Sequence, residues 1–554
     1  MGMRGAAWLP LSLLLAGTLW LAATAAPRRA PAAGTETTHW LAAHSLAVDK
    51  DILFVEADAA RFRAAFGESP RDVRTEPRGD RLEAPYLATR LWGGAIALAG
   101  ERGPLLLNAL AWVLAAIAGA LALRLPLGAA APLWMALFLF GSVAFTAVFR
   151  WQSEVLVFAA VVLAGALAWG RGWARSGARE AEEIYGGDLA ARAALWPWLL
   201  AGLLLGAAAV RHPAYGLLAL PMLFDLPRSP RGRPRLAAFA LFALAVALPV
   251  GAVLALDGAP WDAPAALFSP VLSGWNALFF VLGRNVGLLV GFLPVVLLVL
   301  SPGASGGRRY LPLVVLGAAL LQLQMAPFDW AGGSPAVGNL RFLPLYGALL
   351  FCAGPTLRLR AALLLTLAAA PFVGPYWIAP LSDGASPPPG VAPITSGIRE
   401  RLPFETSLRD LPAGAEIVRG GVRLRAVDHG LRPISGRLTL AAPRAQLLVE
   451  SDRALTSVRL DFSASAPAAL AVEGGTTVGT TYRPTGEVAF EIALGDPARW
   501  HPLWWSRSPV AIYVLGLDLA GSGSKRVPPT PPAGEPVSFD LGLARVASPE
   551  TARP

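Results

Sequence analysis

The stretch LWPWLLAGLLLGAAAVRHPAYGLLALPMLFDL, residues 195–226, decides how many times this chain crosses a membrane. As one helix its 32 residues would be about 48 Å long at about 1.5 Å per residue, too long for one crossing of a hydrocarbon core of about 30 Å. Arg211, His212 and Pro213 interrupt the apolar run. An ionised Arg at a helix centre costs about 2.5–3.5 kcal/mol, and proline removes a backbone donor. We therefore predict two short helices joined by a turn at these residues.

The arginine distribution in neighbouring loops favours the same broken pair. Loops 171–194 and 227–235 are rich in Arg, and they lie on one side of a membrane only if 195–226 crosses twice. That side, the cytoplasm under the positive-inside rule, then also holds Arg124, Arg308, Arg309, Arg358 and Arg360. The opposite side holds four short turns with one arginine each: Arg150, Arg211, Arg284 and Arg341. Short, interrupted apolar segments are also where membrane proteins place binding sites.

The remaining apolar stretches extend this pattern along the first two thirds of the chain. The candidate spans are 7–26, 104–123, 127–149, 154–170, 195–210, 214–226, 236–256, 285–300, 311–327, 342–357 and 361–379. The predicted fold is a mostly α polytopic membrane bundle of about eleven transmembrane helices, followed by a C-terminal all-β sandwich. The first span follows Arg4 and ends in Ala-Thr-Ala-Ala, so it is either a retained helix or a cleaved signal peptide. Both alternatives deliver the next loop outside the cytoplasm.

Composition supports a membrane protein and argues against nucleic acid as a partner. The 554 residues are 55% hydrophobic and only 15% charged, too apolar for an ordinary soluble protein. The net charge of +10 comes almost wholly from arginines between apolar spans, where they orient the chain and contact lipid headgroups. The single cysteine, Cys352, excludes a disulfide framework. High Ala, Gly, Pro and Arg content is typical of a GC-rich bacterial genome, so we expect a multi-pass protein of the bacterial inner membrane.

The polar segments predict three parts. Residues 1–380 form the membrane domain, whose long external loop 27–103 carries an interfacial helix at 37–47 and an interfacial or re-entrant helix at 87–98. Residues 381–398 form a Pro-rich linker, and residues 399–554 form a periplasmic β-sandwich. Alternating apolar and polar runs separated by turn residues predict its strands: 422–427, 446–450, 458–462, 487–492, 510–517 and 537–541.

The first external loop carries a motif with a family resemblance. Residues 34–40 read GTETTHW and residues 44–51 read HSLAVDKD. This resembles a bacterial subset of the GT-C glycosyltransferases, in which Gly-Asp-Glu precedes a His-aromatic helix that runs into Ser-Leu-x-x-Asp-Gly-Asp. Here Thr35 replaces the Asp and Lys50 replaces the Gly. The resemblance implies that a carboxylate deprotonates an acceptor hydroxyl, with Glu36 as the first candidate and Asp49 and Asp51 next. The alternative is a helix-start acid and a solvated turn.

Three further segments resemble the same family. Residues 150–154 (RWQSE) resemble the family's polar turn that ends in Pro-Glu. Residues 329–344 (DWAGGSPAVGNLRFLP) resemble its loop with Trp-x-Gly-Gly and Gly-Asn-Arg. Residues 283–288 (GRNVGL) resemble its Gly-Arg-x-x-Gly-Leu helix start. The planar fork of Arg suits lipid phosphate, although interfacial arginines also snorkel to headgroups. The candidate residues for binding the lipid phosphate or sugar are Arg150, Glu154, Arg211, His212, Arg284, Asn285, Asp329, Trp330, Asn339 and Arg341.

The resemblance implies an inverting GT-C glycosyltransferase. Its expected partners are a polyprenyl-phosphate-linked sugar donor, an envelope glycan, lipid or protein acceptor, and membrane lipids; a divalent metal ion is a possible cofactor. One alternative is a transporter or flippase for a lipid-linked sugar, which requires polar groups at mid-membrane, where acidic residues are nearly absent. A second alternative is a catalytically inactive anchor for the β-domain, and Thr35 in place of the Asp favours it.

Overall fold

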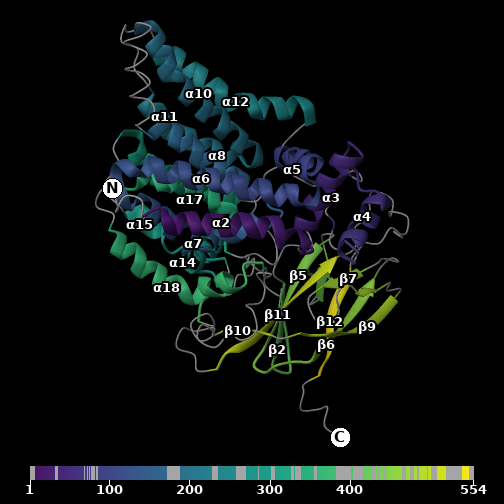
Figure 1. Cartoon of the computed structure of the whole chain (residues 1–554). Helices are drawn as coiled ribbons and strands as arrows, with labels where there is room; N and C mark the ends of the chain where they lie inside the picture. The colour runs from purple at the N-terminus through teal and green to yellow at the C-terminus, as the bar shows by residue number, and fades with distance from the viewer. Residues whose placement is uncertain are drawn as a thin grey trace. The chain divides into compact units, whose positions relative to one another are not determined.

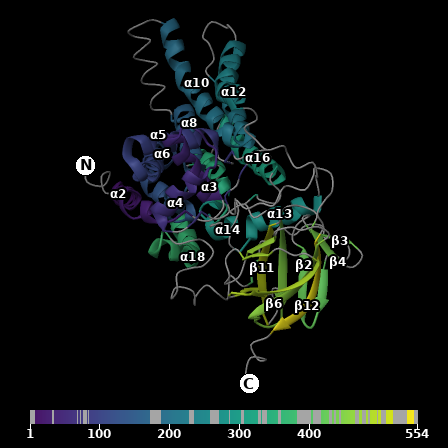
Figure 2. The ribbon, with the colours of Figure 1, turned by 90° about the vertical axis from the view of Figure 1, so that its right-hand side faces the viewer.

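The computed structural model divides the chain into two compact units, drawn in Figures 1 and 2. The first comprises Met1–Ala266 and Val286–Ala392, and the second Leu267–Asn285 and Pro393–Pro554. The structure describes all residues except 1–6, 32–34, 68, 71–72, 74, 76–80, 83–84, 171–186, 227–234, 258–269, 285, 301–305, 326–329, 331–337, 355–357, 382–400, 404–415, 427–430, 435–436, 441–443, 465–469, 474–479, 483–485, 496, 501–507, 519–538 and 548–554. The predicted site residues Asn285 and Asp329 lie outside the described residues, as does most of the predicted linker.

The first unit is built from helices. The α-helices are α2 (Leu9–Thr24), α3 (Thr35–Val48), α4 (Glu56–Phe66), α5 (Tyr86–Ala99), α6 (Gly103–Leu127), α7 (Ala131–Phe140), α8 (Glu154–Trp169), α10 (Gly187–Arg211), α11 (Leu220–Asp225), α12 (Arg235–Asp257), α14 (Leu288–Gly291), α15 (Val295–Leu300), α16 (Leu311–Met325), α17 (Leu343–Leu349) and α18 (Leu359–Ile378). Short 3-10 helices that matter for the site are η1 (Ala26–Arg28), η2 (Gly100–Arg102), η4 (Val143–Phe149), η5 (Pro213–Ala219) and η7 (Leu340–Phe342).

Several of these helices are compatible with a membrane. By length and composition, four segments of the described chain could cross one: Leu9–Arg28, Tyr86–Arg124, Leu236–Leu256 and Leu359–Ile378. A fifth is possible if Gly128–Phe140 and Val143–Phe149, which bend by 71° at their junction, form one broken span. Other apolar helices are shorter, such as Glu154–Trp169. The protein is therefore mostly helical with apolar helices that could cross a membrane, and the eleven crossings predicted above are not shown.

The predicted break at Arg211, His212 and Pro213 is confirmed. Helix α10 ends at Arg211, His212 adopts an extended conformation, and η5 begins at Pro213. The His212 side chain caps the new helix, because its Nδ1 accepts a hydrogen bond from the backbone N–H of Ala214 at 3.3 Å. Proline at the first position of η5 has no N–H that would need a partner there.

The helices predicted in the first external loop are present, but α3 is not an interfacial helix. Glu36 through Ser45 are all buried, so α3 has no solvent-facing polar side over these ten positions. Helices α4 and α5 contact it, and the Trp40 ring packs edge-on against Phe62 at 5.2 Å and Phe66 at 5.4 Å. Residues 37–47 therefore form a core helix of this unit. The second predicted helix, 87–98, corresponds closely to α5.

Close packing of α8, α10 and α12 holds the segment around the break. Helix α8 contacts α6, α10 and α17, and α10 also contacts α12. Gly202 and Gly206 lie one turn apart on α10 where it meets α12. A Cβ atom at Gly206 would lie 2.3 Å from the carbonyl oxygen of Val246. These glycines let the two helix backbones approach closely, as small residues commonly do between membrane helices.

The second unit combines one helix with two antiparallel sheets. The helix is α13 (Pro270–Leu282); sequence patterns had not assigned it to the β-domain. One sheet has the order β1-β2-β5-β11-β7-β8, with β10 paired to β11, and the other has the order β3-β4-β12-β6-β9. The strands are β1 (Glu416–Arg419), β2 (Val422–Ala426), β3 (Leu431–Ile434), β4 (Arg437–Leu440), β5 (Arg444–Ser451), β6 (Ser457–Ala464), β7 (Leu470–Glu473), β8 (Thr480–Tyr482), β9 (Gly486–Ala493), β10 (Ala498–Trp500), β11 (Val510–Asp518) and β12 (Phe539–Ala547).

Five of the six strands predicted from alternation match β2, β5, β6, β9 and β11 to within three residues at each end. The sixth prediction, 537–541, is displaced, because β12 begins at Phe539 and continues to Ala547. Two antiparallel sheets are what a β-sandwich requires. The alternation therefore predicted the β character of this unit correctly.

Candidate functional site

A polar turn between η4 and α8 is the centre of the candidate site. It runs from Arg150 to Ser153, and two other elements hold its backbone carbonyls. Asn108 of α6 donates from Nδ2 to the carbonyl of Arg150 at 3.1 Å. Nδ1 of His39 on α3 lies 2.6 Å from the carbonyl oxygen of Trp151. A carbonyl only accepts, so the His39 ring carries its proton on Nδ1.

Two buried ion pairs lie at the ends of this turn. Nη1 of Arg150 lies 3.2 Å from Oε1 of Glu36, and the two side chains are only 2% and 5% exposed. Nη2 of Arg211 lies 3.1 Å from Oε1 of Glu154, and Nε of Arg211 donates to Oγ of Ser153 at 2.9 Å. The first pair joins α3 to the turn, and the second joins the end of α10 to the start of α8. Low dielectric strengthens the attraction within each pair, and the cost of removing both charges from water opposes it.

Arg341 and His212 extend the cluster on the Arg211 side. The carbonyl of Arg341 accepts hydrogen bonds from the Tyr215 hydroxyl and from Nε2 of Gln322, the latter at 3.3 Å. Burial, then the neighbouring Arg211 and Arg341, lowers the pKa of His212 to about 3. His212 is therefore neutral at pH 7, and because its Nδ1 accepts from Ala214, its proton is on Nε2. Among the described residues, that buried Nε2 has no hydrogen-bond partner.

Arg29, directly after η1, is another cation at the Glu36 end. Burial lowers the pKa of its guanidinium; the Glu36 carboxylate raises it and Arg150 lowers it. Arg29 therefore lies close enough to both members of the buried pair to interact with them electrostatically. The sequence analysis did not select it, because it follows a span boundary without any motif.

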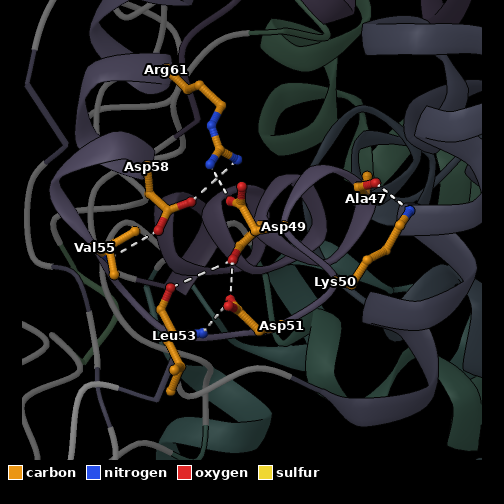
Figure 3. Close-up of polar contacts among 9 residues, drawn as sticks. Ala47, Asp49, Lys50, Asp51, Leu53, Val55, Asp58 and Arg61 are labelled. Atoms are coloured by element: carbon orange, nitrogen blue, oxygen red, sulfur yellow. Dashed lines mark hydrogen bonds and ion pairs between the residues drawn. The ribbon is translucent and has the colours of Figure 1, made fainter.

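Asp49 and Asp51 lie at the C-terminal end of α3, in the turn shown in Figure 3. Asp49 pairs with Arg61 of α4, which also lies 3.4 Å from Asp58. Asp51 accepts from Oγ of Ser45 at 2.9 Å and from the backbone N–H of Leu53 at 3.1 Å. Within the described part of the chain, these contacts are local to α3, α4 and the turn between them. The structure does not bring Asp49 or Asp51 into contact with Arg150 or Arg211.

Lys50 and Asp58 complete this turn. Lys50 has a left-handed backbone with φ of 67°, and its Nζ donates to the carbonyl of Ala47 at 2.7 Å. Asp58 accepts from the backbone N–H of Val55 at 2.9 Å at the start of α4. Burial raises the pKa of Asp58, while the bond from Val55 and the Arg61 charge lower it. These residues connect α3 to α4 as a structural turn.

The residues directly before α17 approach η4, the helix that precedes the polar turn. Gly338 has φ of 59°, and a Cβ there would lie 2.6 Å from Cγ2 of Val143 in η4. Glycine is needed at this position both for the backbone conformation and for the close approach. Asn339 is fully buried, and the Trp330 ring lies 6.2 Å from that of Phe342. The predicted residues Asn339 and Arg341 therefore lie in a segment, residues 338–342, that packs beside η4.

Arg284 lies in the other unit from Arg150, Arg211 and Arg341. It belongs to the second unit, where its backbone N–H donates to the carbonyl of Pro403 at 3.0 Å and its guanidinium donates to the carbonyl of Arg499. Of the four turn arginines, the structure brings together Arg150, Arg211 and Arg341. Any shared role of these three residues with Arg284 stays a prediction.

No family model, curated protein or solved structure matches this chain. Among the described residues, no group of three or more His, Cys, Asp or Glu side chains is placed to hold a metal ion.

Four polar residues of the site were missed by the sequence analysis: His39, Asn108, Tyr215 and Gln322. Asn108 and Gln322 are buried within the apolar helices α6 and α16, and Asn108 also accepts from Nε1 of Trp92 at 3.0 Å. Uncharged polar residues inside apolar segments are costly to bury and commonly functional. A lone Asn or Gln inside an apolar helix is therefore a signal that the sequence itself carries.

Proposed function

We propose that this chain is a multi-pass glycosyltransferase of the bacterial inner membrane, of GT-C type. It moves a sugar from a polyprenyl-phosphate donor to an envelope acceptor at the periplasmic face. The short helices that flank the buried turn complete a bundle of about eleven crossings, with the N-terminus in the cytoplasm and the β-unit in the periplasm. The resemblance of residues 34–51, 150–154 and 329–344 to that family supports the proposal.

One observation carries the proposal most directly: the unsatisfied Nε2–H of His212. This donor is buried beside Arg211 and Arg341, and no described residue accepts its hydrogen bond. A buried donor without an acceptor costs about 1–3 kcal/mol, so such sites commonly bind a ligand or water. Two guanidinium groups beside it select an anionic acceptor, and phosphate oxygens match the planar fork of Arg. A lipid phosphate meets both requirements.

The proposed reaction needs few protein groups. The acceptor hydroxyl oxygen attacks the anomeric carbon from the face opposite the phosphate, and its proton passes to the Glu36 carboxylate. The bond between the anomeric carbon and the phosphate oxygen breaks, and the lipid phosphate leaves with the electron pair. Arg211, Arg341 and the His212 N–H stabilise the developing negative charge. Asp49 and Asp51 are second choices as the base, because the structure holds them in a local turn.

A binding measurement tests the anion site. Protein in nanodiscs is titrated with undecaprenyl phosphate and, separately, with undecaprenol, which has the same tail without the phosphate. We expect phosphate-dependent binding that Arg211→Gln and Arg341→Gln each weaken by about tenfold or more, the effect of losing a charged hydrogen bond. Arg63→Gln, on the exposed side of α4, is the control. Equal binding of the two lipids, or variants that bind like wild type, would refute the site.

A deletion strain tests the transfer. Mass analysis of its envelope glycans should show the loss of one sugar, restored by the wild-type gene and not by Glu36→Gln. Unchanged glycans in the deletion strain contradict the proposal.

A second function, an inactive anchor for the β-unit, is favoured by Thr35 and by the Glu36–Arg150 pair. A threonine hydroxyl cannot act as the carboxylate base of the family pattern, and Glu36 is engaged with a guanidinium. Under this function the glycan change in the deletion strain would be restored equally by wild type and by Glu36→Gln.

A further inference from the structure

Glu36, the proposed base, is held in a buried contact. Its Oε1 is bonded to Nη1 of Arg150, and little of either side chain is exposed. An acceptor hydroxyl must come within hydrogen-bond reach of a Glu36 oxygen before its proton can transfer. Because this carboxylate is only 5% exposed and Arg150 occupies Oε1, the proposed reaction is favoured by separation of the ion pair.

The backbone of Arg150 is fixed, so its side chain is the part that can change partner. The Arg150 carbonyl accepts from Asn108, and Asn108 in turn accepts from Nε1 of Trp92. The next carbonyl along the chain, that of Trp151, bonds His39. Helices α3, α5 and α6 thus hold this turn from separate directions. In the proposal below, only the Arg150 side chain changes its partner, and the helices keep their places.

The same turn carries the proposed phosphate site at its other end. Ser153 and Glu154 bond Arg211, and Arg211 adjoins His212. A phosphate held there would be a second anion within the short segment that begins at Arg150. Phosphate offers three oxygens and binds guanidinium bidentately, so it can compete with a carboxylate for a guanidinium.

We propose that Arg150 is a latch on Glu36 that opens when an anionic lipid phosphate binds beside Arg211. In the closed state Arg150 bonds Glu36. In the open state Arg150 bonds the phosphate, and Glu36 faces the acceptor with Arg29 still close enough to balance its charge. The latch rests on the proposed function and adds an order to it, because the base becomes available only after the donor has bound.

A double-mutant cycle tests the latch through lipid-phosphate affinity. If opening the pair opposes binding, Glu36→Gln should tighten undecaprenyl phosphate binding by about tenfold, within the usual range of coupling between sites. Removing a negative charge alone would also tighten binding. The cycle separates these causes: with a latch, Glu36→Gln has no effect in the Arg150→Gln background, because no pair remains to be broken. With simple electrostatics the tightening persists there.

The surface variant Glu56→Gln, which removes an equal charge from the exposed side of α4, is the matched control. Should Arg150→Gln fail to fold, infrared difference spectra of wild type supply the second measurement. Adding undecaprenyl phosphate should shift a carboxylate band that is missing in Glu36→Gln, and adding undecaprenol should not.

The outcomes distinguish the two proposals. If wild type does not prefer the phosphate over undecaprenol, the proposed function fails and the latch fails with it. If wild type prefers the phosphate but Glu36→Gln binds no more tightly, the latch is overturned while the function stands. Tightening that persists in the Arg150→Gln background, or an unshifted carboxylate band, also overturns the latch.

Discussion

Arg211 and Glu154 are 57 residues apart in the chain, yet Nη2 of one lies 3.1 Å from Oε1 of the other in a largely buried contact. Arg211 is the last residue of α10 and Glu154 is the first of α8. The pair therefore joins the helix break at His212 to the polar turn that follows η4. This connection brings residues from separate segments of the chain together around the proposed anion site.

Replacement of Glu36 by Gln should lower sugar transfer by about 100-fold or more, because an amide cannot accept the acceptor proton. The measurement is transfer from lipid-linked sugars extracted from native membranes. Glu56→Gln makes the same chemical change on an exposed part of α4 and should leave transfer unchanged. Retained binding of undecaprenyl phosphate by Glu36→Gln shows that the variant is folded; full activity would remove Glu36 from the reaction.

Protonation of His212 should destabilise the protein at low pH. Its pKa is near 6.5 when unfolded and about 3 when folded, so the unfolded state binds a proton that the folded state does not. Its contribution to stability is complete above pH 6.5 and is lost as the pH falls towards 3. At pH 5 this loss is about 2 kcal/mol.

The variant His212→Asn isolates this effect. Asparagine still offers an oxygen that can accept from the Ala214 N–H, but it does not titrate. Lowering the pH from 8 to 5 should lower the melting temperature of the variant by less than that of wild type. An identical fall in both proteins would show that His212 is not the titrating group.

Gly206→Ala should destabilise the contact between α10 and α12. The added Cβ would meet the carbonyl oxygen of Val246 and the ring of Pro249, both within 3 Å, and the helices must separate to admit it. Overpacking of this kind costs about 1–3 kcal/mol. Gly251→Ala, on α12 with no heavy atom near the new Cβ, is the control. The melting temperature in detergent should fall with Gly206→Ala and stay unchanged with Gly251→Ala.

Lys50→Gly should stabilise the turn between α3 and α4 by about 1 kcal/mol. Lys50 adopts a left-handed backbone that costs a residue with a Cβ about 1–2 kcal/mol and costs glycine little. The lost bond from Nζ to Ala47 is exposed and contributes little. Lys50→Ala loses the same bond without relieving the backbone, so its melting temperature should not rise. Equal effects of the two substitutions would show that the backbone conformation is not strained.

Local patterns predicted much of the fold. Arginine and proline cannot continue an apolar helix, so the break after Arg211 was predictable from three adjacent residues. Alternation with period two predicted five strands closely, because alternate side chains face opposite sides of a sheet. Burial of α3 was not predictable, since it depends on α4 and Trp151 covering a helix that is distant from Trp151 in sequence. No local sequence pattern predicts that α13 belongs to the same unit as the strands.

Some residues of the candidate site could be predicted from local motifs, and others could not. Motifs selected Glu36, Glu154, Arg211, His212 and Arg341 as chemically suitable residues. They also selected Asp49 and Arg284, which the structure places in a local turn and in the second unit. Motifs missed Arg29 and Asn108, whose roles depend on which groups lie near them in space.

The sequence by itself determined where helices break, which segments are apolar enough for a membrane, and which part of the chain forms strands. These properties depend on neighbouring residues, through backbone hydrogen bonding, hydrophobicity and side-chain alternation. Only the tertiary structure decided that Glu36 pairs with Arg150 and Glu154 with Arg211. Ion pairing depends on a separation of a few ångströms between side chains 114 and 57 residues apart, and helix packing sets that separation.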